Sequence, residues 1–277
     1  MNFLKLNIKT HMLIFMAIVL VIGLVMNFST TALIQIILTP VISIVLDLLI
    51  FKIKKVKQKP DEAAITGMIL ALLISPNLMF AVIAPIAAII LKHIIVYKKI
   101  NIFNPAALSA FLVSLAGAGI GWWAASYVVI PLGLFLAWRL EKLRLSFTFL
   151  ILYIILNMAV FPLSANVRSF VEPVTWFFAF FMLLEPKTSP YTKKGQYIFG
   201  AGAAVISVIM IIIAAPVDIF IVSLLIMNLT KNWLNKKFSD MPQQSAAKTK
   251  SGYPDLTPFG ETQQAYATTL SGKVRTF

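Results

Sequence analysis

The stretch "ALIQIILTPVISIVLDLLIFKIKKVKQK", Ala32 to Lys59, is an apolar run followed by a cluster of lysines. The apolar part, near residues 31–51, is long enough to cross a bilayer as a helix, which takes about 20 residues. Lysines that gather directly after such a run are typical of the cytoplasmic ends of membrane helices. The stretch therefore predicts a transmembrane helix whose lysine-bearing end faces the cytoplasm.

The composition of the whole chain favours a membrane protein. Hydrophobic residues make up 60% of the 277 residues and charged residues 12%, which is about half the charged fraction of a typical soluble domain. The net charge is +14, but the cations lie in short clusters between apolar runs, so we expect membrane lipid and no nucleic acid as partners. The absence of cysteine excludes a thiolate-held iron–sulfur cluster on this chain.

Apolar runs along the chain predict about ten transmembrane helices in an all-α integral membrane protein. The first run lacks a small-residue cleavage site, so we expect it to be a retained span and not a signal peptide. The predicted spans lie near 12–28, 31–51, 63–75, 79–91, 106–121, 122–138, 145–161, 171–184, 197–215 and 217–230.

The distribution of cations predicts the orientation of these spans. Of the 24 lysines and arginines, 23 lie at the two ends of the chain or in the even-numbered connections, and only Arg168 lies in an odd-numbered connection. Lysine and arginine mark the cytoplasmic side of a membrane protein. We therefore expect a multi-pass protein of the inner or plasma membrane with both termini in the cytoplasm.

Two of the predicted spans, Ala63–Ser75 and Val171–Leu184, are short, and they resemble each other. At an offset of 110 residues "ALLISP" aligns with "FMLLEP". Because each half would contain five spans, the second half would be inverted relative to the first. Short helices at corresponding positions of inverted repeats point to a central binding site. In an alternative interpretation, residues 63–91 form a re-entrant hairpin that does not cross the membrane fully.

This pattern predicts the organisation of the chain. Residues 1–238 would form a polytopic membrane domain built from two inverted five-helix repeats, about 1–121 and 122–238. Residues 239–277 lack apolar periodicity and are rich in Ser, Thr, Gln and Lys. We expect them to be a polar cytoplasmic tail that is disordered or depends on a partner for its structure.

Asp47 is the clearest ionisable residue inside a predicted span. Ionisable groups within the membrane are costly and therefore mark functional sites such as ion pathways. The alternative is an interfacial ion pair between Asp47 and Lys52 or Lys54 near the end of the same span.

Three glutamates at span ends are further candidates for an ion pathway. Glu62 and Glu172 precede the two short spans, where a carboxylate also stabilises a helix start through the helix dipole. Glu185 precedes Pro186 in "LLEPKTSP", where it could equally pair with Lys187.

Catalytic and metal-binding motifs are absent from the sequence. His11 and His93 are the only histidines, and they do not have the paired spacing of haem ligands. No His, Asp and Glu cluster has metal-site spacing, no Ser–His–Asp set is arguable, and no glycine-rich phosphate loop follows a strand. We therefore assign no catalytic residue and no metal ligand.

The window from Lys92 to Leu108 combines features of a cofactor site. Lys92 and His93 precede "NIFNPAAL", in which Asn104 stands before Pro105 and is a favourable N-cap for the next helix. Capping does not explain Asn101, nor the cations upstream. Amides, cations and free N–H groups at a helix start suit an anionic or planar ligand.

Three motifs in order resemble the RnfD/NqrB family, which comprises membrane subunits of the ion-translocating Rnf and sodium-pumping NADH:quinone oxidoreductase complexes. The motifs are "AAITGMILALLISP" (Ala63–Pro76), "NIFNPAAL" (Asn101–Leu108) and "FFMLLEPKTSP" (Phe180–Pro190). The resemblance covers about residues 60–190. It implies two five-helix halves and a subunit that passes electrons through flavin, coupled to the movement of Na⁺ or H⁺.

The resemblance also implies a cofactor. Family members carry FMN covalently on a threonine in an "SGAT"-like loop, but the matching loop here, "AGAGIGWW" (Ala116–Trp123), contains no threonine. We therefore expect riboflavin or FMN to be held non-covalently, with Asn101 and Asn104 matching the family's Asn-x-x-Asn-Pro and Thr66 as a further candidate. Lys92 and His93 complete the set of predicted cofactor-binding residues.

Besides a purely structural membrane subunit that anchors soluble redox partners, two functions remain open from the sequence. In the first, the chain is not an enzyme alone but one subunit of an oxidoreductase and translocase complex. Its partners would then carry the iron–sulfur or nucleotide-binding centres that the chain lacks. In the second, the chain is a channel or secondary transporter for a small solute or ion, which suits inverted five-helix repeats equally well.

Overall fold

The computed structural model describes residues 6–56, 59–97, 100–160 and 172–239. These residues are about 74% helical, with almost no sheet. One short hairpin pairs β1 (Val96–Tyr97) with β2 (Ile100–Asn101) in antiparallel register. The helices are α1 (Ile8–Met26), α2 (Thr30–Ile53), α3 (Asp61–Leu73), α4 (Leu78–Ile94), α5 (Pro105–Leu115), α6 (Val129–Arg139), α7 (Leu143–Val160), α9 (Pro173–Phe177), the π-helical turn η2 (Phe178–Met182), α10 (Lys193–Ile212) and α11 (Ile219–Lys237).

The fold is that of a multi-pass all-α membrane protein. Four of the described helices, α1, α2, α7 and α10, are long and apolar enough to cross a membrane. The two short spans predicted from the sequence correspond to α3 and to α9 with η2. The ten-helix inverted repeat and the division into a membrane domain and a tail stay predictions.

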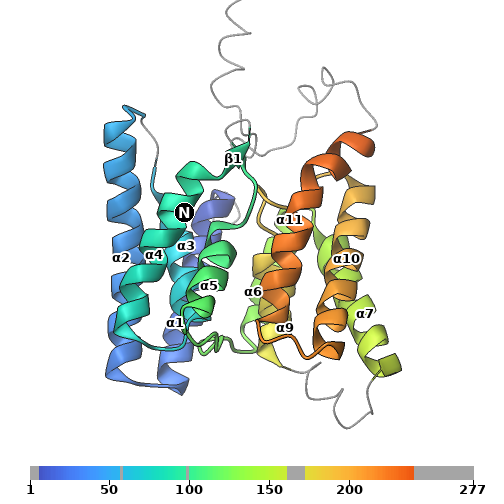
Figure 1. Ribbon diagram of the computed structural model, residues 1–277, viewed down its shortest axis with the longest axis horizontal. Coiled ribbons are helices and arrows are strands. Elements are labelled where there is room, and N and C mark those ends of the chain that lie inside the picture. The colour runs from blue at the N-terminus through green and yellow to red at the C-terminus, as the bar shows by residue number, and fades with distance from the viewer. Residues whose placement is uncertain (1–5, 57–58, 98–99, 161–171, 240–277) are drawn as a thin grey trace, which may run out of the picture. The chain divides into compact units, whose positions relative to one another are not determined.

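The helices pack in two neighbouring groups. In the first, α2 contacts α3 and α4, and α4 contacts α5; in the second, α10 contacts α7 and α11. Figure 1 shows the first group on the left and the second on the right. Helix α1 packs on α3 in the first group, and α6 packs on η2 and α7 in the second. Contacts of α1 with α6 and of α5 with α11 join the two groups.

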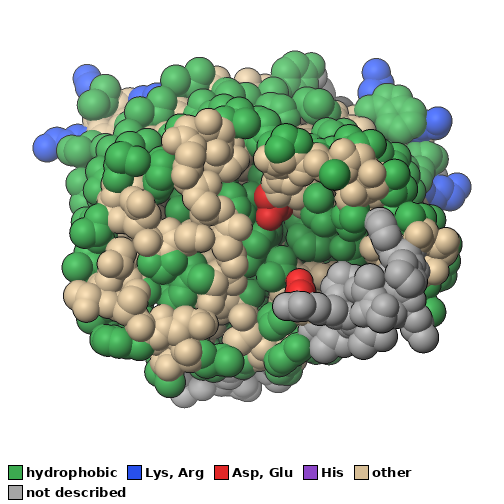
Figure 2. Space-filling model, turned by 60° about the horizontal axis from the view of Figure 1, so that its bottom comes forward, with side chains coloured by type: hydrophobic (Ala, Val, Ile, Leu, Met, Phe, Trp, Pro, Cys, Tyr) green, Lys and Arg blue, Asp and Glu red, His purple; other side chains and the backbone are tan. Residues whose placement is uncertain are grey.

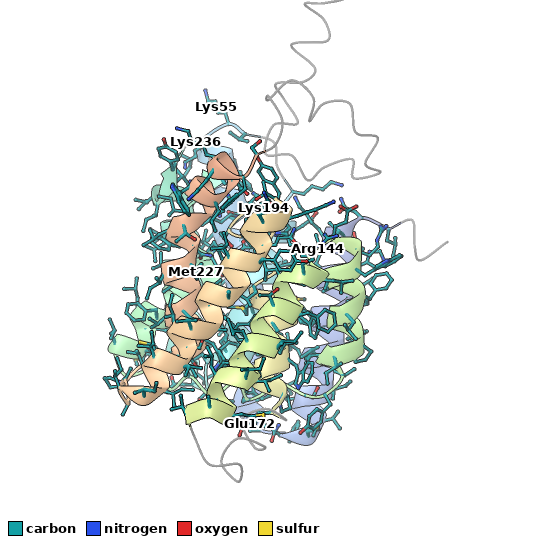
Figure 3. All side chains as sticks on the ribbon, turned by 90° about the vertical axis from the view of Figure 1, so that its right-hand side faces the viewer. Lys55, Arg144, Glu172, Lys194, Met227 and Lys236 are labelled. Carbon is teal, nitrogen blue, oxygen red and sulfur yellow. The ribbon has the colours of Figure 1, made fainter. Side chains whose placement is uncertain are left out.

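All lysines and arginines among the described residues lie toward one end of the helices, which we call the basic end. It contains the C-terminal ends of α2, α4, α6 and α11 and the N-terminal ends of α1, α7 and α10. Figure 3 shows Lys55, Lys194 and Lys236 toward this end and Glu172 at the other, the opposite end. Figure 2 shows the opposite end, whose near face is mostly hydrophobic or uncharged with a few acidic side chains.

The predicted junction between two spans at Gly121–Trp122 is wrong. Helix α5 ends at Leu115 and α6 begins only at Val129, with turns and a single isolated bridge between them. Gly117 begins this connection with a φ of 95°, a conformation that suits glycine. The residues of this connection are nearly all apolar, so an apolar run predicts helix where the chain forms a loop. Arg168 and the predicted tail, except Ser239, lie outside the described residues.

Two prolines determine how α2 and α4 pack. Pro40 in α2 lies against Gly67 of α3, where an added Cβ would lie 2.5 Å from the Cα of Pro40, so the two helix backbones touch. Pro85 in α4 has no N–H for the carbonyl of Ala81. The hydroxyl of Thr39 donates to that carbonyl instead, at 3.2 Å, which satisfies a polar group that lipid could not.

Candidate functional site

Asp47 lies at the centre of a buried cluster at the basic end. Its carboxylate is fully buried and accepts hydrogen bonds from the ammonium of Lys92, at 3.1 and 3.0 Å. His93 Nε2 lies 2.7 Å from Asp47 Oδ1, and Lys54 Nζ lies 3.4 Å from His93 Nδ1. We call these four residues the Asp47 cluster. Lys92, not Lys52 or Lys54, forms the ion pair with Asp47.

The Asp47 cluster ends a line of buried polar residues along α2. Gln35, Thr39, Ser43 and Asp47 follow one another at every fourth position, and each is at most 1% exposed. Residues four apart lie on one face of a helix, so this face of α2 is polar along most of its length. Gln35, Thr39 and Ser43 are not among the residues predicted from the sequence, although their four-residue spacing inside an apolar run is visible there.

The side chain of Gln35 caps the C-terminal end of α3. Its amide donates to the carbonyls of Ala71 and Ile74, at 3.0 and 2.8 Å, and accepts from the N–H of Asn77. These carbonyls belong to a helix that ends inside the protein because Ile74 is extended and Pro76 follows. The end of this short helix is thus satisfied by a neutral side chain.

Glu62 joins the two groups of helices at the basic end. Its Oε2 lies 2.6 Å from Lys187 Nζ, and its Oε1 lies 3.2 Å from Lys9 Nζ. Glu62 belongs to the first turn of α3 and Lys187 to the connection before α10. Thr66, a predicted cofactor residue, donates to the carbonyl of Glu62 at 2.8 Å.

Glu185 lies in a second polar cluster, after η2. It is partly buried, and its Oε2 accepts from the hydroxyl of Thr188 at 2.8 Å. Three lysines surround this segment: Lys142 before α7, Lys187 in the same connection, and Lys231 in α11. We call Glu185 and these three lysines the Glu185 cluster.

Two lysines of this cluster, Lys142 and Lys231, donate to backbone carbonyls. Lys142, which is 5% exposed, donates to the hydroxyl of Ser189 and, at 3.4 Å, to the carbonyl of Leu184. Lys231 donates to the carbonyl of Lys187. Ammonium groups therefore satisfy carbonyls that follow the end of η2. Neither Lys142 nor Lys231 is among the site residues predicted from the sequence, where they count only as charges that indicate orientation.

Burial moves the pKa values of Glu185 and Lys142 toward each other. Loss of hydration raises the pKa of the Glu185 carboxyl to about 7, because the hydrogen bond from Thr188 and the positive charges of Lys187 and Lys142 offset it only in part. Burial, helped by the charge of Lys231, lowers the pKa of the Lys142 ammonium to about 7, against the attraction of Glu185. Both groups thus change charge near neutral pH.

The predicted cofactor residues have different partners within the protein. Lys92 and His93 bind Asp47, and Thr66 binds the backbone of Glu62. Asn101 lies in β2, opposite Val96.

Asn104 is 2% exposed and caps α5. Its side chain accepts from the N–H of Ala107, at 3.0 Å. Its own N–H donates to the side chain of Asn228, which in turn donates to the carbonyl of Thr188. The side-chain oxygen and the N–H of Asn104 are therefore engaged within the protein.

The loop Ala116–Trp123 closes the opposite end. The N–H groups of Gly121 and Trp122 both donate to the carbonyl of Leu73. Trp122 has a φ of 47°, rare for a tryptophan, and its indole donates to Asp218 at 2.6 Å. The loop offers no hydroxyl for covalent FMN, so its residues do not fit that attachment.

Glu172 precedes the first turn of α9 and lies at the opposite end (Figure 3). The structure thus brings Asp47 together with Lys92 and His93, and Glu62 into contact with Lys187, next to Glu185. It does not bring Glu172 to either cluster. In the described part of the chain, no group of three or more His, Asp and Glu residues could hold a metal ion.

Residues 108–242 match the sequence model of the NQR2, RnfD, RnfE family, which confirms the resemblance seen in the motifs. The matched segment includes "FFMLLEPKTSP" and the loop Ala116–Trp123. It begins after Asn104, so the motif with the two asparagines lies almost wholly outside it. No curated relative matches the chain.

Proposed function

We propose, from the membership of residues 108–242 in the NQR2, RnfD, RnfE family, that this chain couples electron transfer to cation movement. The family indicates a membrane subunit of Rnf- and Nqr-type complexes, and so one part of a multi-subunit assembly. In our proposal the partners carry the nucleotide-binding and iron–sulfur centres, because the chain has no cysteine. They would dock on the basic end, which the positive-inside rule assigns to the cytoplasm.

The observation that carries the ion-moving part is the pair of buried clusters around Asp47 and Glu185. Acidic groups inside a membrane protein are costly and therefore favour a functional role. Each of these two acids has lysines beside it: Lys92 pairs with Asp47, and Lys187 and Lys142 act on Glu185. Glu62, whose carboxylate bridges Lys9 and Lys187, connects the two groups of helices next to the Glu185 cluster.

Flavin binding by this chain is a separate part of the proposal. Covalent attachment lacks an acceptor in Ala116–Trp123, and the side chains of Asn104, Thr66, Lys92 and His93 are hydrogen-bonded within the protein. We therefore assign no electron-transfer step to them. Riboflavin or FMN held non-covalently is tested by the visible spectrum of the purified chain, because a bound flavin is yellow and an empty protein is colourless.

The second candidate is a channel or secondary transporter without a redox role. The loop Ala116–Trp123, which lacks the threonine of the family motif, is the observation that favours it. Both candidates predict cation movement, but only the redox subunit makes that movement depend on an electron donor.

The experiment that separates the candidates uses membranes from cells with and without the chain. A redox subunit is required for electron transfer from the donor to the membrane acceptor, and adding back the full chain restores that activity. Unchanged electron transfer in membranes that lack the chain would contradict the proposal and support the transporter.

A further inference from the structure

Four backbone carbonyl oxygens around Glu185, those of Leu184, Glu185, Lys187 and Thr188, accept hydrogen bonds from protein donors. The carbonyls of Leu184 and Lys187 accept from Lys142 and Lys231. The carbonyl of Glu185 itself accepts from the N–H and hydroxyl groups of Ser189, at 3.1 and 2.7 Å. The side chain of Asn228 takes the carbonyl of Thr188.

These contacts leave few ligands for a metal cation. A hard cation such as Na⁺ is held by several oxygen atoms, often backbone carbonyls that replace its hydration shell. In this segment, two of those carbonyls hold ammonium groups. The carboxylate of Glu185 is the remaining anionic oxygen donor nearby, and Glu62, the other carboxylate, binds Lys187 and Lys9.

The charges around Glu185 also oppose a second cation. Lys142 reaches the segment from the connection before α7, Lys231 from α11, and Lys187 belongs to the segment itself. A sodium ion beside Glu185 would lie among like charges in a partly buried place, where repulsion is weakly screened. A proton transferred to the carboxyl removes a charge and needs no further ligands.

The first group of helices shows that a charge is not needed to cap this backbone. In the predicted repeat, with its offset of 110 residues, Ile74 would correspond to Leu184, and the carbonyl of Ile74 accepts from the neutral amide of Gln35. The same carbonyl position in the second group binds the ammonium of Lys142. Lys142 thus holds its positive charge on the carbonyl of the residue before Glu185, and this charge favours the ionised Glu185 carboxyl.

Asp47 follows the same rule. Lys92 binds both of its carboxylate oxygens, and His93 contacts one of them. Cationic protein groups thus lie beside both of these carboxylates.

We infer that this chain exchanges a proton, and not sodium, at Glu185, with Lys142 as the positioning residue that controls when the carboxyl ionises. This inference rests on the proposed function in assuming that a cation is moved, and it specifies which one. The proton passes on or off one carboxylate oxygen of Glu185, with no other bond formed or broken. The pKa of that carboxyl, raised to about 7, places the exchange near neutral pH.

The test is an infrared pH titration of the purified full chain in detergent. The carbonyl stretch of protonated carboxyl groups is followed from acid to alkaline pH, once in sodium chloride and once in choline chloride at equal ionic strength. We expect a signal with a midpoint near pH 7 that is the same in both salts. A midpoint that falls by about one pH unit for each tenfold increase in sodium, as direct competition requires, would overturn the inference.

Variants assign the signal. Glu185→Gln removes it, and Glu141→Gln, which changes an exposed carboxyl next to Lys142, leaves it unchanged. Lys142→Met moves the midpoint to higher pH, because the charge of Lys142 favours the ionised carboxyl, whereas Lys142→Arg keeps it near its original pH. A signal that remains in Glu185→Gln, or whose midpoint is unchanged in Lys142→Met, would contradict the assignment.

The sodium comparison uses only the unaltered chain, so the inference stays testable even where a variant does not fold. It also separates this inference from the proposed function. A sodium-independent titration of Glu185 in a chain that proves dispensable for electron transfer would keep the proton site and remove the redox role. Sodium competition at Glu185 in a chain that is required for electron transfer would keep the redox role and remove the proton-specific site.

Discussion

Lys142 and Glu185 both lie in surroundings that disfavour their charged forms. Each is ionised in water at neutral pH, yet burial disfavours the charged form of both. Such a pair costs folding free energy, and residues of this kind are retained where a function needs them. Asp47 is different, because the direct ion pair with Lys92 offsets its burial.

The raised pKa of Glu185 makes stability depend on pH. Between the ordinary pKa of 4.5 and about 7, the folded state binds a proton that the unfolded state has released, so stability falls as the pH rises. At about 1.4 kcal/mol per pKa unit this loss amounts to about 3 kcal/mol.

Glu185→Gln carries no such penalty, because its side chain does not titrate. We expect its melting temperature in detergent to match that of the parent at pH 4.5 and to exceed it at pH 8. A difference that stays constant across this range would contradict the raised pKa.

Asp47 supports a prediction at the same scale. Asp47→Asn leaves the ammonium of Lys92 buried without its carboxylate, which typically costs about 3–5 kcal/mol. Adding Lys92→Met to that variant removes the unpaired charge and should restore part of the stability. Thermal unfolding of the two single variants and the double variant measures this coupling, and strictly additive losses would show that Asp47 and Lys92 do not interact.

At the scale of elements, the contact of α3 with α2 depends on the absence of a side chain. An added Cβ on Gly67 would lie 2.5 Å from the Cα of Pro40, 2.8 Å from the hydroxyl of Ser43 and 2.9 Å from the carbonyl of Thr39. Two of these atoms are backbone, so they cannot move away without moving α2. The polar face of α2 therefore keeps its place against α3 only with glycine at this position.

Gly67→Ala should lower the stability of the protein, by about 1–3 kcal/mol as overpacking usually does. Gly202→Ala is the matched control, because its added Cβ would meet only the flexible side chain of Met227 and alanine favours a helix. Melting temperatures of both variants in one detergent test the contact. Equal effects of the two substitutions would show that α2 and α3 do not touch at Gly67.

The sequence predicted the membrane helices better than their ends. Apolar runs and lysine clusters identified the long helices correctly, since composition alone decides whether a segment can cross lipid. The boundary at Gly121–Trp122 failed because the loop Ala116–Trp123 is as apolar as a helix. The predicted partner of Asp47 failed for another reason: Lys92 is 45 residues away in the sequence, and local spacing cannot reveal such a contact.

At the scale of the whole molecule, the charges of the two ends predict the orientation in the membrane. The positive-inside rule places the basic end in the cytoplasm. The chain has no cysteine, so a single introduced cysteine reports the side on which it lies.

Lys194→Cys and Lys236→Cys lie toward the basic end and Glu172→Cys at the opposite end (Figure 3). We expect a membrane-impermeant maleimide to label Glu172→Cys in intact cells, and to label the other two only in inverted vesicles. Labelling of Lys194→Cys from outside intact cells would reverse the proposed orientation.

Proton movement through Glu185, driven by electron transfer, is tested most directly in inverted membrane vesicles. We expect donor oxidation to acidify the vesicle interior in the parent, and Glu185→Gln to abolish acidification while the complex still assembles. Glu141→Gln should acidify like the parent. Full acidification in the Glu185→Gln vesicles, or none in the parent vesicles despite active electron transfer, would contradict it.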